Sequence, residues 1–504
     1  MSITNSIITW QMKKRYQRIE FFMNHPHEVQ KKCLNELVDA AKNTAFGKKY
    51  SFKNIYSYED FRNNIPLHSY EDIFPYINKT LQGEQNILWP SEIKWFARSS
   101  GTTNDKSKFI PVSAEALYDC HYRSGKDMLA MYCHEFKKAG IFEGKCLFMG
   151  GSHEINRLND KSYVGDLSAI IIDNLPFWIN WRRSPDKKTA LLGNWEEKLE
   201  KMADIAIQEN ITTLSGVPSW TLVLLKRVLE KTGKANIEEV WPNIEMFMHG
   251  GVKFDPYIEQ YNKLFPSGKM KYIETFNASE GYFGAQLENK VRDLLLLVDH
   301  GIFYEFIPLH EINKEQPKTL PLNEVEINKA YAMVISTNAG LWRYLLGDTI
   351  KFTSVNPYRF IILGRTKYCI NAFGEELMID NVEKAIQIVC EKLKVKINDY
   401  TAAPIFLEKE GCGAHEWVIE FEENPSDLNY FIESLDNALK TLNSDYEAKR
   451  YKNMVLHQPE VIAVPKGTFY KWFKSKNKLG GQNKIPRLSN DRAFVEEIKK
   501  FILQ

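Results

Sequence analysis

Small hydroxyl side chains and lysines gather in one stretch of the chain, "WFARSSGTTNDKSKFIPVS", which runs from Trp95 to Ser113. A polyphosphate needs inward-facing backbone N–H groups, small side chains that allow close approach, and a cation nearby. The small residues here are Ser99, Ser100, Gly101, Thr102 and Thr103, and the cations are Lys106 and Lys108. The Walker pattern G-x-x-x-x-G-K-[ST] is absent. Taken alone, the stretch is equally compatible with a phosphate cradle and with a surface loop rich in serine and threonine.

Two later stretches place acidic residues after strand-like segments. In "ETFNASEGYFG" (274–284), Glu280 follows a strand that ends at Phe276. A carboxylate at the binding edge of a sheet can hold Mg²⁺ on a nucleotide, and an aromatic ring there can stack on a purine. In "GLWRYLLGDTIKF" (340–352), Asp348 could accept hydrogen bonds from ribose hydroxyls. Each stretch also has a plainer interpretation, a turn glutamate and a common Gly-Asp turn.

Basic residues stand in two further stretches. The segment "ILGRTKYCINAFGEELMIDNVEKAI" (362–386) lies where the composition shifts, which is typical of a hinge, and its Arg365 and Lys367 could meet a nucleotide. Lys484 lies in the Gly-rich stretch "GGQNKIPRL" (480–488). An exposed lysine is usually only a solvated charge, so neither stretch is decisive alone.

The elements that would position these residues alternate between strand and helix from about 85 to 365. Strands are predicted at 145–151, 244–251 and 269–276, a helix at 194–210, and a short strand, a Pro-marked turn and a helix within 211–233. This alternation predicts a parallel α/β sheet. Residues 293–309 predict two antiparallel strands around a turn, and 330–355 continues in the same style. A mixed sheet or small barrel is therefore expected beside the parallel sheets.

The two ends of the chain differ from this central part. Residues 10–45 predict a helix, with apolar positions every three or four residues. Trp10 with Lys13, Lys14 and Arg15 could suggest a helix at a membrane surface, but a helix that docks on the body of the protein is preferred. Residues from about 366 to 504 predict a small α+β unit with helices near 378–394 and 427–442 and a strand at 416–423.

Composition limits the classes of function. A chain of 504 residues is too long for one compact core. Its formal net charge of +2 gives no electrostatic argument for nucleic acid binding, and its 7 cysteines form no C-x-x-C pair, so neither a disulfide framework nor a zinc site is indicated. No signal peptide and no apolar stretch of about 20 residues is present. We therefore expect a cytoplasmic protein that binds neither nucleic acid nor membrane.

The order and spacing of these motifs resemble the acyl-adenylate-forming superfamily, and more closely the auxin-responsive Gretchen Hagen family of acyl acid amido synthetases. The features that carry the resemblance are "SSGTTNDKSKFIP", with Lys108 at its basic position, "NASEGYFG", "GLWRYLLGD" and "KIPR". It spans roughly residues 30 to 490. One departure is Asp105, which stands where plant members tend to have glycine and puts a carboxylate near the phosphates.

The resemblance implies an α/β fold with two domains. Residues 1–365 would be a large N-terminal domain that binds ATP and the acyl substrate, with α/β sheets and a small β-barrel-like part, and 366–504 a smaller, mobile α+β lid domain. The implied enzyme uses ATP and Mg²⁺ to adenylate a carboxylic acid and then transfers the acyl group to an amino acid. Its partners would be these small molecules, and the sequence carries no signal for an oligomeric state.

The resemblance also implies roles for individual residues. Nucleotide binding is implied for Ser99, Ser100, Gly101, Thr102, Thr103, Phe276, Asn277, Ala278, Ser279, Asp348, Arg365 and Lys367. Catalytic roles are implied for Lys108, for Glu280 as the Mg²⁺ ligand, and for Lys484, which the C-terminal domain would bring in during adenylation. The acyl pocket is expected at the strand ends Val217, His249, Gly250 and Gly251, although His249 has an alternative interpretation as a core histidine.

Two rival functions remain. An acyl-CoA ligase would share the adenylation step but pass the acyl group to a thiol, and the Lys-x-Pro-Arg ending favours the amide instead. A non-catalytic nucleotide-binding regulator would be expected to have lost at least one of Glu280, Asp348 and Lys484, all of which are intact.

Overall fold

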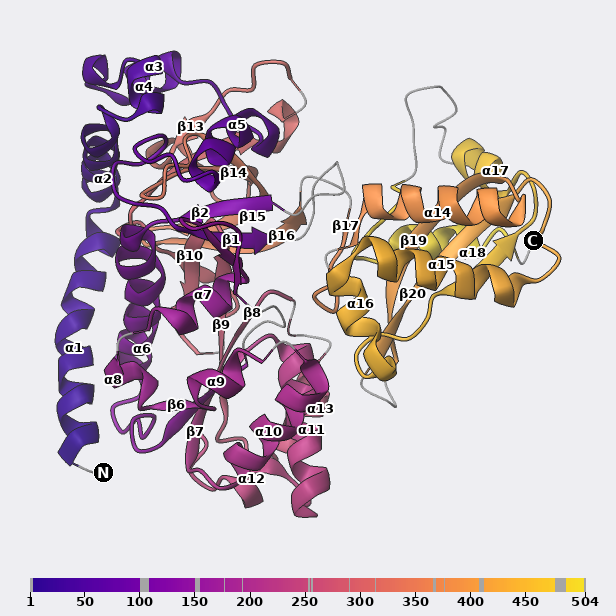
Figure 1. The fold of residues 1–504 in the computed structure, drawn as a ribbon, viewed down its shortest axis with the longest axis horizontal. Coiled ribbons are helices and arrows are strands. Elements are labelled where there is room, and N and C mark those ends of the chain that lie inside the picture. Colours follow the sequence, from indigo (N-terminus) through magenta and orange to yellow (C-terminus); the bar gives the residue numbers. More distant parts are fainter. Residues whose placement is uncertain are drawn as a thin grey trace. The chain divides into compact units, whose positions relative to one another are not determined.

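The computed structural model describes residues 3–99, 108–149, 155–175, 177–192, 194–252, 254, 257–289, 291–312, 314–365, 369–375, 377–407, 412–475 and 486–502. The chain forms two compact units (Figure 1). The first contains Met1–Ser99, Lys108–Gly251 and Tyr261–Thr366, and the second contains Ser100–Ser107, Val252–Gln260 and Lys367–Gln504.

One mixed sheet runs through the first unit, in which twelve strands are described. Their order is β13 (Leu320–Pro321), β12 (Ile302–Pro308), β14 (Ala330–Thr337), β15 (Tyr344–Val355), β16 (Tyr358–Arg365), β11 (Leu294–Leu296), β10 (Gly281–Gln286), β9 (Lys271–Ala278), β8 (Met246–Gly250), β7 (Ile211–Gly216), β3 (Lys145–Phe148) and β6 (Arg183–Ser184). The pairs from β9 to β6 are parallel and the others antiparallel. The antiparallel strands thus continue the parallel sheet and are not a separate barrel.

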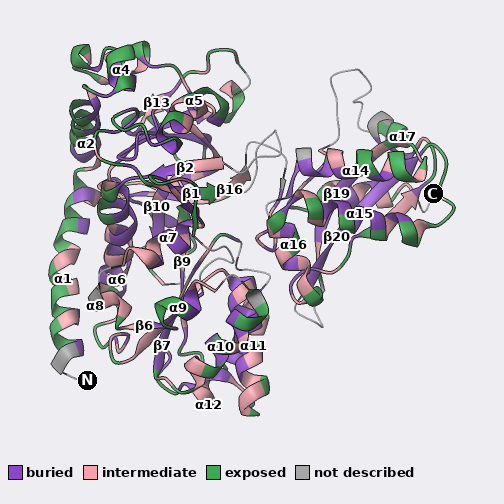
Figure 2. Ribbon diagram, in the orientation of Figure 1, coloured by how far each residue is buried: buried purple, intermediate pink, exposed green. Residues whose placement is uncertain are grey.

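A second sheet carries the predicted phosphate-binding stretch. Its order is β2 (Lys108–Val112), β1 (Trp95–Ser99), β5 (Tyr163–Gly165) and β4 (Asn156–Arg157). β1 runs antiparallel to β2 and parallel to β5. Phe96 and Ala97 of β1 and Ile110 of β2 are fully buried, so this small sheet is fixed by the same apolar core as the large one (Figure 2).

Helices surround the sheets of the first unit. The longer ones are α1 (Ile3–Asn24), α2 (Pro26–Ala41), α5 (Tyr70–Leu81), α6 (Arg123–Glu135), α10 (Trp195–Ile207) and α11 (Pro218–Thr232). The shorter ones are α3 (Ala45–Lys49), α4 (Tyr58–Asn64), α7 (Leu167–Asp173), α8 (Phe177–Asn180), α9 (Lys187–Ala190), α12 (Ile237–Val240), the π-helical η2 (Ala116–Tyr122) and the 3₁₀ turns η1 (Phe52–Asn54), η4 (Leu309–Glu311) and η5 (Leu322–Glu324). The helix α13 (Ile258–Leu264) begins in the stretch assigned to the second unit and ends in the first. Within the described part of the chain, no helix is both long enough and apolar enough to cross a membrane.

The strand–helix alternation predicted for the central part is confirmed at β3, α10, β7, α11, β8 and β9. The prediction of a single helix over 10–45 is wrong, because the chain breaks between α1 and α2. Pro26 has no backbone N–H and is tolerated at the first turn of a helix but not in its interior, so a new helix begins there. α1 packs along α6, where the Arg15 guanidinium forms an ion pair with the buried carboxylate of Asp127.

The antiparallel pair predicted within 293–309 is also wrong. The strands β11 and β12 flank the turn, but β11 pairs with β10 and β16, while β12 pairs with β13 and β14. A side chain of α2 lies where the hairpin ladder would have been. The Gln30 amide donates to the carbonyl oxygens of Val298 and Ile302, at 2.8 and 2.9 Å, and accepts from the N–H of Tyr304 at 2.9 Å. These backbone groups therefore form their hydrogen bonds with a side chain of α2 rather than with a neighbouring strand.

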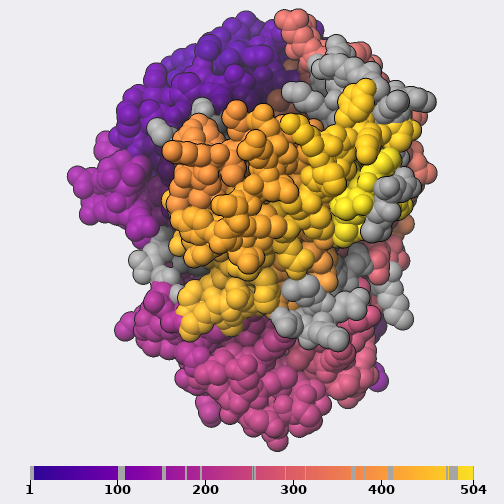
Figure 3. Space-filling model, turned by 90° about the vertical axis from the view of Figure 1, so that its right-hand side faces the viewer, coloured from indigo at the N-terminus to yellow at the C-terminus, as the bar shows by residue number. Residues whose placement is uncertain are grey.

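The second unit is an α+β body, orange to yellow in Figure 3. Its sheet contains β19 (Ile397–Leu407), β20 (Cys412–Phe421) and β21 (Glu460–Val464), and β17 (Cys369–Ile370) pairs with β18 (Leu377–Met378). Its helices are α14 (Ile379–Leu393), α15 (Leu428–Leu442), α16 (Ser444–Arg450), α17 (Thr468–Ser475), α18 (Ala493–Lys499) and the 3₁₀ turn η6 (Tyr451–Asn453). The helices predicted near 378–394 and 427–442 and the strand at 416–423 are confirmed.

Candidate active site

The predicted phosphate-binding stretch links the end of β1 to the start of β2. Ser99 and Lys108 pair with each other across the antiparallel ladder, so the two ends of the stretch lie side by side. Ser100, Gly101, Thr102 and Thr103 lie outside the described residues, as does Asp105. Of the predicted phosphate ligands in this stretch, the structure therefore gives the positions of Ser99 and Lys108.

Lys108 is held between two tyrosines. Its ammonium donates to the hydroxyl of Tyr344 at 3.3 Å and lies 5.5 Å from the ring centroid of Tyr70 and 5.9 Å from that of Tyr344. The Tyr70 hydroxyl accepts a hydrogen bond of 2.8 Å from the N–H of Phe109, the next residue of β2. A cation over aromatic faces is attracted by their negative quadrupoles. The half-buried ammonium thus has a defined position although lysine is a flexible side chain.

Glu280 approaches the same tyrosine from the turn between β9 and β10. Ala278 and Gly281 pair across this hairpin, so Ser279 and Glu280 form a two-residue connection. The pKa of Tyr70 is raised to about 12, mainly by burial; the hydrogen bond from the N–H of Phe109 lowers it, and the negative charges of Glu71 and Glu280 raise it. The carboxylate of the second motif and the ammonium of the first therefore both lie near Tyr70.

The third and fourth motifs meet in the β15–β16 pair. Asp348 of β15 is 7% exposed, and it pairs with Arg365, the last residue of β16. The preceding Gly347 has a φ of 91°, in the left-handed region that favours glycine. Tyr344, which contacts Lys108, begins the same strand. Lys367 and Lys484 lie outside the described residues.

The predicted adenine-side residues differ in their surroundings. Phe276 is half-buried, and its ring centroid lies 5.1 Å from that of Phe283 and 6.1 Å from that of Phe360, so one side of it belongs to the core. Asn277 is exposed, and Ala278 packs partly against the core at the end of β9. Asn277 and Ala278 are both next to the turn that carries Ser279 and Glu280, which is the position expected of residues on the adenine side of a nucleotide.

A Mg²⁺ ion that arrives with ATP fits the residues present. Among the described side chains, no group of three or more His, Cys, Asp or Glu residues could form a metal cage. Mg²⁺ bound with substrate phosphates typically takes only one or two protein carboxylates and keeps several waters. The half-buried Glu280, in the turn between β9 and β10, could supply such a carboxylate.

The candidate acyl residues lie at the carboxyl ends of β7 and β8. Gly216 pairs with His249 across these parallel strands, and Val217 caps α11 directly after β7. A Cβ added to Gly251, whose φ is 83°, would lie 3.4 Å from a methyl group of Val217. The His249 side chain is 3% exposed, and burial lowers its pKa to about 3. A neutral imidazole offers no positive charge, so any contact of His249 with an acyl carboxylate would be a hydrogen bond.

Gly250 is predicted to be intolerant of a side chain. A Cβ at this position would lie 2.4 Å from the carbonyl oxygen of Thr275 on β9, so the backbone of one strand must shift. We expect Gly250→Ala to lower the free energy of unfolding in urea by about 1–3 kcal/mol. Gly125→Ala in α6 is the control, because no atom lies within 4 Å of the added Cβ, and it should be neutral or stabilising. Equal unfolding midpoints for the two variants would contradict the prediction.

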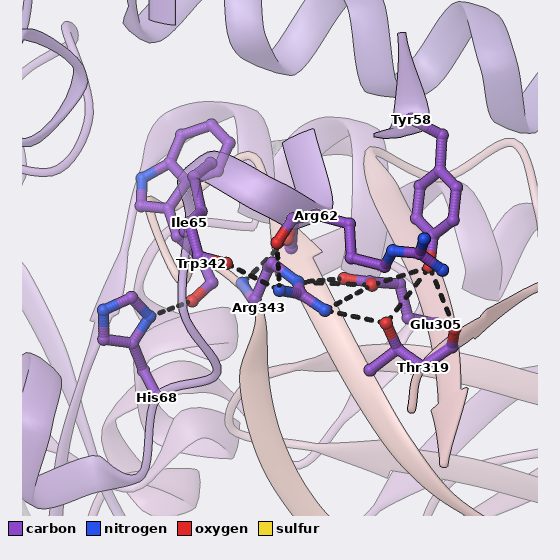
Figure 4. A network of polar contacts seen from close by, with 9 residues as sticks. Tyr58, Arg62, Ile65, His68, Glu305, Thr319, Trp342 and Arg343 are labelled. Atoms are coloured by element: carbon purple, nitrogen blue, oxygen red, sulfur yellow. Dashed lines mark hydrogen bonds and ion pairs between the residues drawn. The ribbon is translucent and has the colours of Figure 1, made fainter. Parts of the chain in front are cut away.

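Sequence reasoning missed a buried network around Arg343, within the motif "GLWRYLLGD" (Figure 4). The Arg343 guanidinium donates to the Glu305 carboxylate, at 2.9 Å from both Nε and Nη2, and to the Thr319 hydroxyl at 2.7 Å. It also donates to the carbonyl oxygens of Ile65 at 2.6 Å and Arg62 at 3.0 Å. Arg343 and Glu305 are 4% and 1% exposed. This arginine is therefore a structural residue that ties the segment after α4 to the sheet.

The same network brings the two tyrosines together. The N–H of His68 donates to the carbonyl oxygen of Arg343, and the N–H of Leu345 donates to that of His68, both at 2.9 Å. His68 and Tyr344 thus form a parallel bridge, which places Tyr70, two residues further on, beside the start of β15. Tyr70 lies outside every motif, and its site partners Lys108 and Phe109 are more than 35 residues away in sequence, so no local pattern signals its role.

In the second unit, the "KIPR" element is anchored on β19. The Arg487 guanidinium forms an ion pair with Asp399 and lies 4.5 Å from the ring centroid of Tyr400. Arg487 follows Lys484 by three residues, so the chain is fixed to the sheet a short distance after the lysine that was predicted to act in adenylation.

Comparisons with known proteins agree with this arrangement. The fold is that of adenylate-forming enzymes. The solved structure of 2-hydroxyisobutyryl-CoA ligase in complex with 2-HIB-AMP and CoA matches with a TM-score of 0.53 and 12% identity, over 96% of this chain and 93% of that one. The structure of the AtGH3.15 acyl acid amido synthetase in complex with 2,4-DB matches with a TM-score of 0.63 and 16% identity, over 98% and 96%.

The chain belongs to the GH3 family. The family's N-terminal, central and C-terminal domains match residues 15–270, 295–365 and 380–493. Indole-3-acetic acid-amido synthetase GH3.3 of Arabidopsis thaliana is 22% identical over 96% of this chain and 93% of its own length. Jasmonoyl-L-amino acid synthetase GH3.5 of Oryza sativa subsp. japonica is 23% identical over 92% of each. The resemblance drawn from the motifs is confirmed.

Proposed function

We propose that this protein is an ATP-dependent acyl acid amido synthetase. It adenylates a carboxylic acid, releasing pyrophosphate, and then conjugates the acyl group to the amine of an amino acid, releasing AMP. Family membership supports the class of reaction, since the curated relatives are named as amido synthetases or amino acid ligases. The plant acids in those names are not carried over to this chain, whose identity to them is 21–23%.

The observation that carries the proposal is that the Lys108 ammonium lies over the ring of Tyr70, whose pKa the charge of Glu280 also raises. Lys108 and Glu280 come from segments more than 170 residues apart, and they have opposite charge. ATP with its Mg²⁺ presents the complementary pair, anionic phosphate oxygens for the lysine and a cation for the carboxylate. If the stretch that ends at Lys108 were only a solvated surface turn, we would not expect the lysine side chain to be held between Tyr70 and Tyr344.

In the first step, a carboxylate oxygen of the acid attacks the α-phosphorus of ATP, and the bond from that phosphorus to pyrophosphate breaks. Lys108 would stabilise the negative charge on the phosphate oxygens, and Ser279, next to Glu280 in the second motif, would contact the α-phosphate. In the second step, the amino acid nitrogen attacks the acyl carbonyl, the bond to AMP breaks, and the nitrogen gives up a proton. AMP is a far better leaving group than the hydroxide or oxide of a free acid.

Further residues have proposed roles in the same site. Glu280 would hold Mg²⁺, which when bound neutralises phosphate charge. Asp348 would accept hydrogen bonds from the ribose, Phe276 and Asn277 would face adenine, and the strand ends at Val217 and Gly251 would adjoin the acyl group. We also propose that residues 366–504 act as a lid that supplies Lys484 during adenylation.

The test is acid-dependent exchange of labelled pyrophosphate into ATP, measured with Mg²⁺ across a panel of aromatic and aliphatic acids. At least one acid is expected to stimulate exchange above the acid-free rate, and Lys484→Ala is expected to abolish that stimulation. Exchange at the wild-type rate in Lys484→Ala would remove Lys484 from the mechanism. A wild-type protein that exchanges with no acid of the panel would contradict the proposal itself.

A further inference from the structure

We infer that Tyr70 and Tyr344 form a clamp that positions Lys108 for the phosphates, an inference that rests on the proposed function. Both are positioning residues, because they are argued to act through the lysine and not on the substrate. Neither has a role in the motif-based account, in which the third motif acts through Asp348 and the segment around Tyr70 has no function.

The clamp has two different contacts. Tyr344 offers both its hydroxyl, 3.3 Å from the ammonium, and its ring, whereas Tyr70 offers its ring, because its hydroxyl accepts the hydrogen bond from Phe109. That bond joins Tyr70 to the strand that carries Lys108. The ring of Tyr70 and the backbone of the lysine therefore move together, and only the lysine side chain remains to be ordered.

The two tyrosines are themselves fixed. Tyr344 is fully buried, and Tyr70 is 7% exposed. Tyr70 is the first residue of α5, whose start is held by a capping box: the Asp72 carboxylate accepts from the N–H of Ser69 at 2.8 Å, and the Ser69 hydroxyl accepts from the N–H of Asp72 at 3.3 Å. The Arg343–Glu305 network holds the start of β15 on the other side. Lys108 thus points between two rigid elements.

Aromatic partners suit a lysine that must bind an anion. A carboxylate in direct contact would orient the ammonium but also neutralise it, and a phosphate would then have to compete for it. The face of a phenol ring favours the protonated amine while leaving its charge available. Glu280, whose charge raises the pKa of Tyr70, would take the cation that accompanies the phosphates.

A double-mutant cycle tests whether the tyrosines act through Lys108. Tyr344→Phe removes only the hydroxyl, and Tyr70→Leu removes the ring at the edge of the core. We expect Tyr344→Phe and Tyr70→Leu to lower kcat/KM for ATP in pyrophosphate exchange by about 5-fold and about 10-fold, and to change it less than about 2-fold in the Lys108→Met background. A purely structural role would give the same factors in both backgrounds.

Tyr76→Phe is the matched control. Tyr76 lies on the same helix as Tyr70, and its hydroxyl accepts from the ammonium of Lys49 at 2.5 Å on the surface of the unit. Since that lysine has no place in the proposed site, exchange should stay at the wild-type rate.

A second readout needs no activity. In the free protein, the rate at which acetic anhydride acetylates Lys108, followed by mass spectrometry and normalised to Lys49, should rise at least about 3-fold in Tyr70→Leu, because the rings stabilise the unreactive ammonium. The clamp would be contradicted if the tyrosine substitutions lowered kcat/KM by the same factors with and without Lys108→Met. An unchanged acetylation rate of Lys108 in Tyr70→Leu would also contradict it. If the wild type exchanges with no acid, the proposed function fails, and the acetylation rate then decides on the clamp alone.

Discussion

Replacing Arg343 by methionine is expected to lower the free energy of unfolding of the first unit by about 3–5 kcal/mol, because it leaves the buried Glu305 carboxylate without its cation. The loss also removes the donors to the carbonyl oxygens of Arg62 and Ile65. The hydroxyl of Tyr58, 3.0 Å from Glu305, is too weak a partner to replace a guanidinium. Urea unfolding followed by tryptophan fluorescence measures the change, since the adjacent Trp342 is fully buried.

Two further variants show whether the burial of charge is the cause. Arg343→Met combined with Glu305→Met removes both charges, and it should recover a large part of the stability that the single substitution loses. Arg227→Met, in an Arg–Glu pair with Glu200 whose side chains are 35% and 44% exposed, should leave the unfolding midpoint nearly unchanged. Equal destabilisation by the Arg343 and Arg227 substitutions would contradict the account.

Replacing Glu280 by glutamine is expected to slow acid-dependent pyrophosphate exchange by about 100- to 1,000-fold, the loss typical of removing one group that stabilises charge in the transition state. Glutamine keeps the size of the side chain and its place in the turn between β9 and β10 but loses the charge that would hold Mg²⁺. The measurement is the exchange rate as a function of Mg²⁺ concentration, with ATP and the acid saturating.

Glu71→Gln is the matched control for this substitution. The charges of Glu71 and Glu280 both raise the pKa of Tyr70, so both carboxylates lie in the same neighbourhood, but only Glu280 stands in the nucleotide motif. Exchange in Glu71→Gln should remain within about 3-fold of wild type. If Glu280→Gln shows the same small effect and the same dependence on Mg²⁺, Glu280 is not the metal ligand.

Much of the fold follows from local pattern. The strand–turn–helix at β7 and α11 is marked by Pro218 at the first helical position, and the amphipathic helices α14 and α15 are evident from their apolar spacing. The break at Pro26 obeys the same rule, and a stricter use of it would have divided the first helix correctly. Local signals of this kind act over one or two turns of chain, which is why they can be found in a single sequence.

Pairing between distant segments is where the sequence-based prediction failed. Two strands around a tight turn predict a hairpin, but the backbone groups at 298 and 302 bind Gln30, which is 268 residues away from the first of them. No property of the segment 293–309 itself indicates that a helix near the N-terminus takes these hydrogen bonds. Register and neighbours in a large mixed sheet depend on such long-range contacts.

The residues of the candidate site also divide into those that a local motif indicates and those that only long-range contacts reveal. Lys108, Glu280 and Asp348 were predicted because each stands in a short motif with its own chemistry. Tyr70 and Glu305 could not be found in this way, because their function lies in contacts with Lys108 and Arg343, 38 residues away in each case. Arg343 itself stood in a motif but was given no role, since burial of a charge is visible only once its partner is known.

The most direct test of the proposed reaction is identification of its products. The protein is incubated with ATP, Mg²⁺, an acid that stimulates pyrophosphate exchange, and a mixture of amino acids, with and without CoA, and the products are analysed by mass spectrometry. We expect AMP and an acyl–amino acid amide in equal amounts, formed whether or not CoA is present. A thioester formed only with CoA, or consumption of ATP without any amide, would contradict the assignment as an acyl acid amido synthetase.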